Sequence, residues 1–582
     1  MGEKILLSSV HIQNYKSIKE VSLPLGPFTI LLGPNNSGKT SILEAINLGL
    51  TSSVVDEEDF HQDCKGGPAD KIIIDLIFEP GGDALVFSDE WCVFSQSVQN
   101  SGSGDKEWFG IRTIINWDEE QEKYVNNKRF LLTKPLNGAE PTLGAEVPKR
   151  QLNYLPVYFV NASRDLSLDI RDKRSTWYKT TSGISIGKDD KKGIEDSIKA
   201  INDKLLEKNP FLSGLAQEIE KGFNEKDGTV NVLPINRDVE QLYKGVGIYY
   251  SNQHCEQISI ESLGLGTRSW AVFSVFKNVI GNRNALADRN GMPCSPILLV
   301  EEPEAHIHPQ KQHTLLKEIR DVESQTVVTS HSSFILSKET LNSIVRVDME
   351  GGSTKASPLK LEKDEIDEAG YRFLRNGGDC FFAKMLVFAE GESEMRLLPC
   401  LFEAKFGINP YQLGIQFIEM NGFGNYGTYI KIAHQLGIPY FIFSDGEKRT
   451  MDSLEKAIKK AFSQSSPIDW SAHPNIMFIP NGDDLEKYLV KTEKDAVKTA
   501  LKTEFGEDFL EKEKKKKQGC KKPGGGIYDF ETIDGEDTLL AAILKGNKTK
   551  YAEILARHFA AKKVFPPLVE NLFSLIKTEI DK

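Results

Sequence analysis

Apolar residues in this chain gather in short runs, most of which end in glycine or in acidic residues and are followed by a helix-forming stretch. Strands that are apolar throughout and alternate with helices are typical of parallel sheets covered on both faces. The pattern therefore predicts an α/β protein. The runs cover residues 28–32, 296–300, 325–330, 385–389 and 439–444, with another short strand leading into 478–486.

The first run leads into a complete Gly-x-x-x-x-Gly-Lys-Thr phosphate loop at 33–40, and helix-forming residues follow from Ser41. Glycines let the backbone N–H groups point at phosphate oxygens, Lys39 places a charge near the β- and γ-phosphates, and Thr40 offers a hydroxyl to Mg²⁺. A glycine-rich hairpin is the alternative, but it requires neither the strand nor the helix. We expect ATP to bind here through Gly33, Asn36, Gly38, Lys39, Thr40 and Ser41.

The run at 296–300 ends in two adjacent acids, which is typical of a Walker B motif. Glu301 is expected to hold Mg²⁺ together with Thr40, and Glu302 to orient the attacking water. The next buried run, 325–330, ends at His331, where a histidine can sense the γ-phosphate. A histidine at a strand end is more often structural, but its place after a Walker B motif favours the catalytic role.

Upstream of the Walker B motif, a glycine-rich segment at 262–268 opens a helical stretch. Such a helix start, with Ser262 and Gly264, can cap the γ-phosphate of a nucleotide held by a second protomer. The phosphate loop and the Walker B motif are also farther apart than a minimal ATPase needs. Residues 166–237 are the expected insertion, because segments 193–206 and 211–219 have apolar residues at helical spacing. They predict either a helical arm that pairs protomers or a lid on the chain's own domain.

Beyond the polar stretch 351–380, acidic residues follow three further strands. Carboxylates that meet at one edge of an α/β sheet suit Mg²⁺ or Mn²⁺, and two such ions can cleave a phosphodiester. Acids solvated at strand tips are the alternative. The predicted metal-binding carboxylates are Glu390, Glu394, Asp445, Glu447, Asp484 and Glu486.

Composition narrows the class of protein. The apolar fraction of 39% and the charged fraction of 27% describe an ordinary soluble protein. No membrane-spanning run or signal peptide is evident, and the scattered cysteines form no Cys-x-x-Cys pair, so we expect a cytoplasmic protein without a disulfide framework or zinc site. The net charge of −12 argues only weakly against nucleic acid. The lysine-rich stretch 512–522 runs into Pro-Gly-Gly-Gly and predicts a mobile loop.

The order of phosphate loop, glycine-rich signature, Walker B, D-loop-like residues 304–309 and histidine resembles the ABC-type ATPases of the SMC and RecF group. The signature departs from Leu-Ser-Gly-Gly-Gln, and Glu301 replaces the usual aspartate. Glu390-Gly391 followed by Asp445-x-Glu447 resembles a Toprim domain, although Glu447 departs from its Asp-x-Asp pattern. The combination resembles the OLD family of ATP-dependent nucleases, which includes the nuclease subunit of the Gabija antiphage system.

The resemblance implies dimerisation through the insertion and a late lysine that aids cleavage. Lys548 matches that lysine best, while Lys545 and Lys550 compete and are expected to face solvent. We predict an ABC-type ATPase in residues 1–165 and 238–350, an inserted helical dimerisation region at 166–237, a linker at 351–380 and a Toprim domain at 381–582. Dividing 582 residues into about three or four units also agrees with the usual size of domains.

The predicted function is that of a homodimeric or homotetrameric, nucleotide-regulated DNA endonuclease or nickase that uses Mg²⁺ or Mn²⁺, acting in phage defence. A helicase, or a retron reverse transcriptase with its RNA–DNA product, is the kind of companion that the resemblance implies. Two alternatives remain open from the residues: a RecF-like DNA-binding repair ATPase without cleavage, and a Toprim strand-passing enzyme or primase. The absence of a tyrosine in a recognisable nucleophile context disfavours the second.

Overall fold

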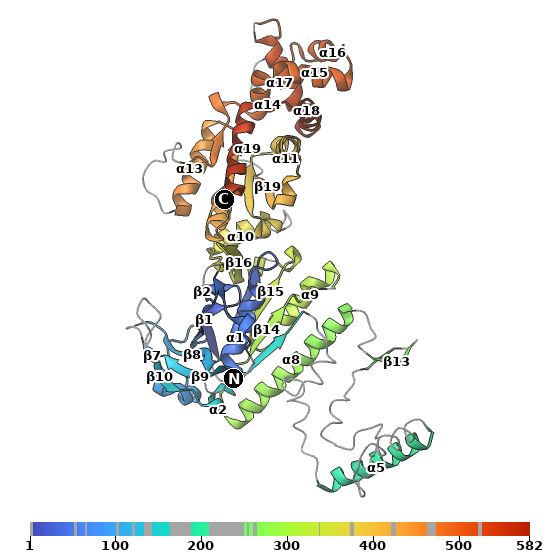
Figure 1. Ribbon diagram of the computed structural model, residues 1–582. Coiled ribbons are helices and arrows are strands. Elements are labelled where there is room, and N and C mark those ends of the chain that lie inside the picture. The colour runs from blue at the N-terminus through green and yellow to red at the C-terminus, as the bar shows by residue number, and fades with distance from the viewer. Residues whose placement is uncertain are drawn as a thin grey trace.

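The computed structural model describes most of the chain in seventeen stretches: residues 4–51, 55–63, 67–100, 104–118, 123–132, 143–162, 188–208, 249–252, 255–259, 265–305, 307–336, 338–372, 378–420, 426–462, 473–521, 527–532 and 534–581. Two sheets and a long helix form one end of the molecule, and a smaller parallel sheet with a helical extension forms the other (Figure 1). None of the described helices is long and apolar enough to span a membrane.

The phosphate loop belongs to a mixed sheet with the strand order β11-β14-β15-β3-β16-β17. Its strands are parallel apart from the antiparallel edge pair β16 and β17. All five residues of β3 and all six of β15 are buried, so neither strand alternates between apolar and solvent-facing residues, although β15 contains the polar residues Gln325, Thr326, Thr329 and Ser330. The strands are β3 (Phe28–Leu32), β11 (Val157–Val160), β14 (Ile297–Glu301), β15 (Gln325–Ser330), β16 (Ile344–Glu350) and β17 (Ser353–Pro358).

A second, antiparallel sheet lies beside the first, with the order β10-β9-β8-β6-β1-β2. Helix α1 (Lys39–Leu50) contacts strands of both sheets, and its apolar side chains join one core with theirs. The second sheet consists of β1 (Ile5–Tyr15), β2 (Ile18–Pro24), β6 (Lys71–Pro80), β8 (Glu107–Asp118), β9 (Lys123–Leu132) and β10 (Leu143–Glu146), with β7 (Gln99–Asn100) paired to β8.

Residues 188–208 of the predicted insertion form helix α5 (Lys188–Lys208), which includes the first expected helical segment. The second segment, 211–219, lies outside the described residues. Farther along, α8 (Leu265–Asn290) begins within the predicted signature at 262–268, and α9 (Pro309–Arg320) connects β14 to β15. The boundaries of the insertion therefore stay a prediction.

The expected linker at 351–380 is more structured than its composition suggested. Strand β17 extends the ATPase sheet by pairing with β16, and α10 (Lys363–Arg372) follows it. Thr354 of β17 bonds the hydroxyl of Ser17 at 2.9 Å, next to the phosphate loop. Polarity was misleading here because an edge strand has one face in water.

The C-terminal half is built on a four-stranded parallel sheet with the order β19-β18-β20-β21. Its strands are β18 (Met385–Ala389), β19 (Ile415–Glu419), β20 (Tyr440–Ser444) and β21 (Ile476–Phe478), and its helices include α11 (Glu392–Phe406), α12 (Tyr426–Gln435), α13 (Lys448–Phe462) and α19 (Pro567–Ile580). Beyond the sheet lies a helical end with α14 (Leu485–Thr492), α15 (Lys494–Phe505), α16 (Phe509–Lys517), α17 (Gly535–Gly546) and α18 (Lys548–Lys562) (Figure 1).

The lysine-rich segment expected to be a mobile loop is instead helical up to Lys517, as part of α16. Lysine and glutamate are both good helix formers, and Phe509 stacks on Phe505 with ring centroids 4.5 Å apart. Good propensity and one apolar anchor thus outweigh the charge of the run. Within it, Lys516 pairs with Glu513 three residues earlier, which screens part of the repulsion.

The two halves meet over a continuous core rather than across a flexible connection. Arg346 of β16 is 4% exposed, and its guanidinium donates to the carbonyl of Leu436 at 2.9 Å and to that of Ala383 at 3.0 Å. It also pairs with Asp348 at 2.6 Å. The core that contains β3 side chains extends without a break to β18 and α12. Arg346 therefore fastens the ATPase sheet to the parallel sheet.

Candidate active sites

The phosphate loop is held in shape by close backbone packing. A Cβ at Gly33 would lie 1.8 Å from the carbonyl oxygen of Val347, so only glycine fits there. Gly38, the residue before α1, has a φ of 95°, and a Cβ there would lie 2.1 Å from the hydroxyl of Thr354. The exposed Asn36 also adopts a positive φ of 61°. The loop is thus shaped by strands β16 and β17 as well as by its own sequence.

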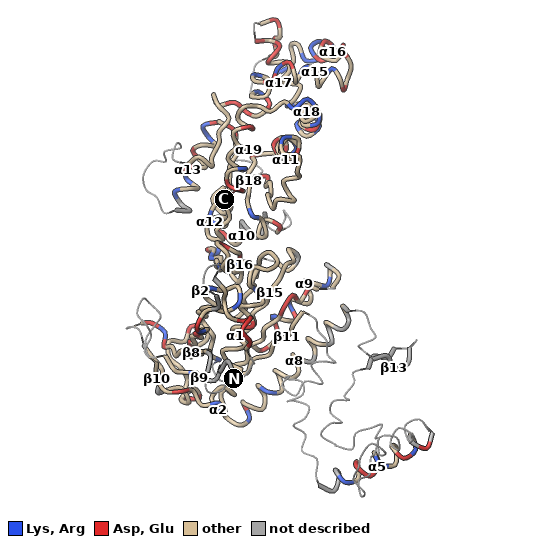
Figure 2. The backbone as a smooth tube through the Cα atoms, in the orientation of Figure 1, with Lys and Arg blue, Asp and Glu red and all other residues tan. Residues whose placement is uncertain are grey.

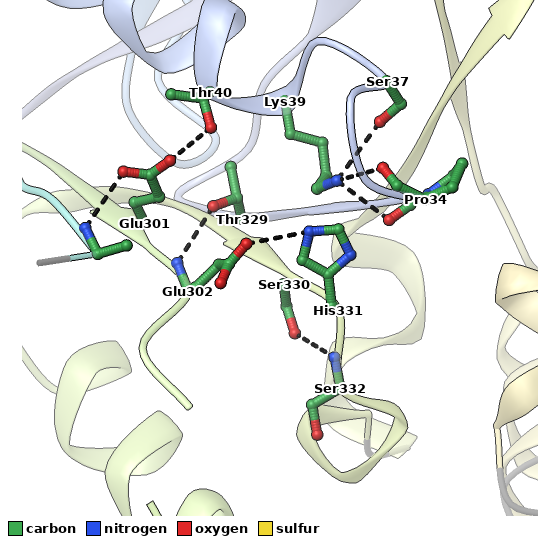
Figure 3. Close-up of polar contacts among 12 residues, drawn as sticks. Pro34, Ser37, Lys39, Thr40, Glu301, Glu302, Thr329, Ser330, His331 and Ser332 are labelled. Carbon is green, nitrogen blue, oxygen red and sulfur yellow. Dashed lines mark hydrogen bonds and ion pairs between the residues drawn. The ribbon is translucent and has the colours of Figure 1, made fainter. Parts of the chain in front are cut away.

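Lys39 is the buried charge of the loop. Its side chain is 5% exposed, and its ammonium donates to the carbonyls of Pro34 at 2.7 Å and Gly33 at 3.0 Å (Figure 3). Burial lowers the pKa of Lys39 to about 8, although the nearby glutamates oppose the shift. An ammonium compensated mainly by neutral carbonyls would gain from an anionic phosphate at this loop.

Thr40 and Glu301 lie together at the end of β14. The Thr40 hydroxyl donates to one carboxylate oxygen of Glu301 at 2.5 Å, and the backbone N–H of Ala162 donates to the other at 3.2 Å. Ser41 is buried on the inner side of α1. Hydroxyl and carboxylate oxygens are the ligands that Mg²⁺ prefers, so this pair suits the expected nucleotide-bound ion.

Glu302 and His331 face each other from neighbouring strand ends. Glu302 has a positive φ of 42°, and its N–H donates to the carbonyl of Thr329 at 3.1 Å. That turn brings its carboxylate within 3.0 Å of the His331 ring (Figure 3). Burial, assisted by the charge of Lys39, lowers the pKa of His331. The imidazole is thereby favoured in its neutral form, which can accept or donate a proton.

From the sequence, Glu304 has no expected role beyond its place in the D-loop-like run. It is 9% exposed, accepts from the Ser330 hydroxyl at 2.7 Å and from the His331 N–H at 2.8 Å, and its pKa is raised by burial. Glu304 thus fixes the backbone that carries His331. The signal was its place two residues after Glu302, but nothing local distinguished it from a solvated acid. The signature residues Ser262 and Gly264 lie outside the described part of the chain.

In the parallel sheet, the predicted carboxylates follow strands whose carboxyl ends share one edge. Glu390 comes after β18 and Asp445 after β20, while Asp484 and Glu486 follow β21 at the start of α14. Glu390 links the two central strands, because it accepts from the Ser444 hydroxyl at 2.7 Å and from the Asp445 N–H at 2.9 Å. It therefore holds Asp445 in position from the neighbouring strand.

The buried acid Glu394 and the half-buried Asp445 repel each other. Burial raises the pKa of Glu394 to about 8 and that of Asp445 to about 7, and the surrounding carboxylates add to both shifts. Glu394 also accepts from the Gly391 N–H at 3.1 Å, which orients it at the start of α11. Closely spaced carboxylates with raised pKa values mark a place where a cation would be stabilised.

Lys548 belongs to this group of carboxylates. Its ammonium lies 3.4 Å from Glu486, whose other oxygen accepts from the Ser393 hydroxyl at 2.8 Å. Burial alone would lower the pKa of Lys548, but the carboxylates of Glu486, Glu394 and Asp445 raise it overall. Of the three candidate lysines, Lys548 is therefore the one whose charge is coupled to the buried acids.

The other two lysines are exposed, as expected, but each also has a partner. Lys545 bonds the carboxylate of Asp484, and the ammonium of Lys550 lies 4.7 Å from the ring centroid of Phe505. Burial favours a higher pKa for Asp484, but the bonds from Lys545 and the Lys487 N–H lower it overall. Glu447, by contrast, is exposed just before α13.

The carboxylate oxygens of these residues suit a divalent ion. Asp445 Oδ1 and Glu486 Oε2 are buried and accept no hydrogen bond. Glu486 Oε2 has the Lys548 ammonium 3.4 Å away, whereas the burial of Asp445 Oδ1 is costly unless a cation compensates it. No three carboxylate, histidine or cysteine side chains among the described residues already gather as a complete ligand set. The donor type fits Mg²⁺ or Mn²⁺, and binding would require the acids to draw together and lose their protons.

The geometry defines a phosphate-loop ATPase joined to a Toprim domain, and comparisons with known proteins agree. A family model described as "AAA domain, putative AbiEii toxin, Type IV TA system" matches residues 28–337, more than half of the chain, and the chain belongs to this family. A second model, "Overcoming lysogenization defect protein-like, TOPRIM domain", matches residues 381–446. It ends before Asp484, Glu486 and Lys548.

Curated relatives cover both domains. The "Old nuclease" of Escherichia phage P2 is 21% identical over 76% of this chain and 77% of its own length. The "OLD nuclease" of Thermus scotoductus is 22% identical over 77% of this chain and 83% of its own. An "Endonuclease GajA" of Bacillus cereus is 24% identical over 47% of this chain and 46% of its own. The resemblance to the OLD family is confirmed, and the domains and relatives together support an ATPase combined with an endonuclease.

Proposed function

We propose that this protein is a nucleotide-regulated, divalent-metal-dependent DNA endonuclease or nickase. The observation that carries the proposal is the group formed by Asp445, Glu394, Glu486 and Lys548 at one edge of the parallel sheet. It combines a buried carboxylate oxygen of Asp445 that accepts no hydrogen bond with the ammonium of Lys548 beside Glu486, on a chain whose relatives are named nucleases.

In this proposal the buried acids and the lysine have different roles. Asp445, Glu394 and Glu486 would hold the ions, with Glu390, Glu447 and Asp484 as further positions of the predicted set. Divalent ions, when bound, activate water and stabilise the leaving oxygen of a phosphodiester. Lys548 places a positive charge where negative charge develops on the phosphate. Glu390 keeps Asp445 in place by accepting a hydrogen bond from the backbone N–H of Asp445.

At the other site, Lys39 and Thr40 would bind the phosphates and the Mg²⁺ of ATP, and Glu302 with His331 would direct the water. Regulation is supported by the contact between the two halves. The loop residue Gly33 packs on the carbonyl of Val347, and the neighbouring Arg346 bonds backbone carbonyls of the Toprim half. A change in the phosphate loop would therefore reach the nuclease domain through β16.

A plasmid assay tests the proposal. Purified protein is incubated with supercoiled DNA and Mg²⁺ or Mn²⁺, with EDTA as the control and with ATP or a non-hydrolysable analogue as additions. Nicked or linear product that requires metal supports the endonuclease. DNA binding with intact supercoils would instead support a RecF-like repair ATPase, and religated topoisomers would support a strand-passing enzyme.

The oligomeric state and the biological role are parts of the same proposal. A homodimer or homotetramer is expected if the segment around Ser262 and Gly264 caps a partner's nucleotide, and sedimentation with and without nucleotide measures this. We further propose phage defence in the cytoplasm, alone or with a helicase or retron companion, as the resemblance to the OLD family implies. Plaque counts on cells that carry the gene with and without its neighbours test that role.

A further inference from the structure

A groove opens between helices α14 and α17 in the helical end. It has a volume of about 540 Å³, within the range of roughly 300–1,000 Å³ that small-molecule sites occupy. The lining side chains from α14 are spaced as one helix face, and those from α17 form another. The groove is lined by Lys487, Val490, Lys491, Tyr528, Asp534, Asp537, Thr538, Ala541, Ala542 and Lys545.

One end of this groove adjoins the proposed nuclease site. Lys545, in the groove wall, bonds Asp484, and Asp484 adds to the raised pKa of Asp445 through its charge. Lys491 pairs with Asp483 at 2.5 Å on the same side. A strand cut at the carboxylates would therefore lie close to this end of the groove.

The lysines at this end retain capacity for phosphate. Lys491 and Lys545 have exposed side-chain fractions of 52% and 36%. Each ammonium has three donors, so pairing with one aspartate leaves others directed outward. Lys487 is exposed beside them. The two ion pairs also hold the ammonium groups in place, which reduces the entropy lost on binding.

The floor and far wall suit a base rather than a second phosphate. Val490, Ala541 and Ala542 supply apolar surface, and Tyr528 adds an aromatic ring that stacks on Phe530 with centroids 5.5 Å apart. Asp534 and Asp537 lie toward the start of α17, away from Lys545, and Asp537 is already paired with Lys494 at 2.6 Å. The groove is thus basic near the nuclease site, apolar along its floor and acidic at its far end.

The helical end as a whole is not uniformly basic, since acidic segments are interleaved with the basic ones (Figure 2). Non-specific attraction of a duplex to this end is therefore weak. A base-paired duplex is also too wide for a cavity of this size, whereas one nucleotide with an unpaired base fits. Aromatic side chains bind unpaired bases by stacking, independent of sequence.

We propose that the groove between α14 and α17 binds an unpaired nucleotide of the DNA strand next to the bond that is cut. Its phosphate contacts Lys487, Lys491 and Lys545, and its base packs against Tyr528 and the apolar floor. The inference rests on the proposed function, because it assumes that this strand is the substrate. The enzyme would accordingly prefer DNA that is frayed, flapped or single-stranded at this position.

Binding in EDTA tests the groove without any cleavage. Fluorescence anisotropy compares the full-length protein on a labelled single-stranded oligonucleotide and on the matching duplex. Tyr528→Ala and Tyr528→Leu should weaken single-strand binding about tenfold, while Tyr528→Phe retains it. Lys487→Ala and Lys491→Ala should each lower the slope of affinity against salt by about 0.7. Lys502→Ala, a lysine on α15 outside the groove, should change neither quantity.

Two results would contradict the proposal that the groove binds an unpaired nucleotide. One is unchanged single-strand affinity in the tyrosine and lysine variants while ATP hydrolysis confirms that they are folded. The other is a loss of duplex affinity as large as the loss of single-strand affinity, or the same loss of single-strand affinity in Lys502→Ala. Failure of the proposed function gives a different result. If the wild-type protein never cleaves DNA but the groove variants still lose single-strand affinity, the nuclease proposal is wrong and the nucleotide-binding groove stands.

Discussion

The Nε2 atom of His331 lies 3.0 Å from a carboxylate oxygen of Glu302, across the ends of two neighbouring parallel strands. Because β14 and β15 are in register from Ile297 to Glu301, the acid that follows one strand and the histidine that follows the other are brought together by the sheet. The pair couples the residue expected to orient water to the one expected to sense the γ-phosphate.

Glu302→Gln should retain nucleotide and slow hydrolysis by about 100-fold or more, since only the water-orienting carboxylate is lost. Release of phosphate from ATP measures hydrolysis, and a fluorescent nucleotide measures binding. Hydrolysis at the wild-type rate would mean that the Walker B register is wrong and that another acid orients the water.

Lys39→Ala should abolish tight nucleotide binding. The substitution removes the buried ammonium that the loop carbonyls hold, and no other charge of the loop reaches the β- and γ-phosphates. Calorimetric titration with ATP and Mg²⁺ is the measurement. Lys311→Ala, an exposed lysine on α9, is the matched control and should bind normally. Equal affinity in the two variants would exclude Lys39 from the site.

Asp445→Ala should eliminate metal-dependent DNA cleavage and leave ATP hydrolysis nearly intact, because the two sites use strand ends of separate sheets. Plasmid nicking and phosphate release are measured on the same preparation. Asp452→Ala, an exposed aspartate on α13, serves as control. A folded Asp445→Ala protein that loses both activities would contradict the assignment of two separate sites.

Lys548→Ala should reduce the initial nicking rate more than Lys545→Ala, and Lys550→Ala should have the smallest effect. Lys548 is the lysine coupled to the buried carboxylates, Lys545 acts through Asp484, and Lys550 lies over Phe505. Rates are compared under saturating Mn²⁺, and metal binding by Lys548→Ala should remain measurable. A Lys548→Ala protein no slower than the others removes this lysine from the site.

Stability without metal should fall as pH rises. The pKa values of Asp445 and Glu394 in the folded protein are raised to about 7 and about 8. The folded state then holds protons that the unfolded chain has lost, so the stabilisation is complete below about pH 4 and is lost as pH rises through about 7 to 8. In EDTA, Asp445→Asn should therefore raise the Tm at pH 8 and have little effect at pH 5.

The matched control is Glu447→Gln, which should not alter the Tm because Glu447 is exposed. Mg²⁺ or Mn²⁺ should raise the wild-type Tm at pH 8 more than at pH 5, since the ions bind the ionised acids. A Tm difference between wild type and Asp445→Asn that is the same at both pH values would contradict the raised pKa.

The sequence was most informative where function depends on a few consecutive residues. The phosphate loop, the two acids after β14 and the histidine after β15 are local patterns, and their strands are buried on both faces and hence recognisable. Lys548 was also singled out from the sequence; in the structure it begins α18, which Asn547 caps by accepting from the Lys550 N–H at 3.1 Å.

Relationships between distant segments were harder to predict. The ion pair of Lys545 with Asp484 joins α17 to the start of α14, and no local pattern indicates it. Glu304 reads as a surface acid until the fold buries it beneath His331. Strand β17 is polar because it lies at a sheet edge, and it was therefore mistaken for part of a linker.

The Arg346 contacts have an evolutionary consequence. A fragment that begins after the ATPase half would expose the apolar surface of β18 and α12, and it would leave the carbonyls of Ala383 and Leu436 without their donor. A fragment that contains only the ATPase half would leave the guanidinium of Arg346, which is 4% exposed in the whole protein, without these carbonyl acceptors. Recombination that exchanges one half for a homologous half therefore has to preserve the contacts between the halves. We accordingly expect the two halves to be inherited together rather than exchanged as independent modules.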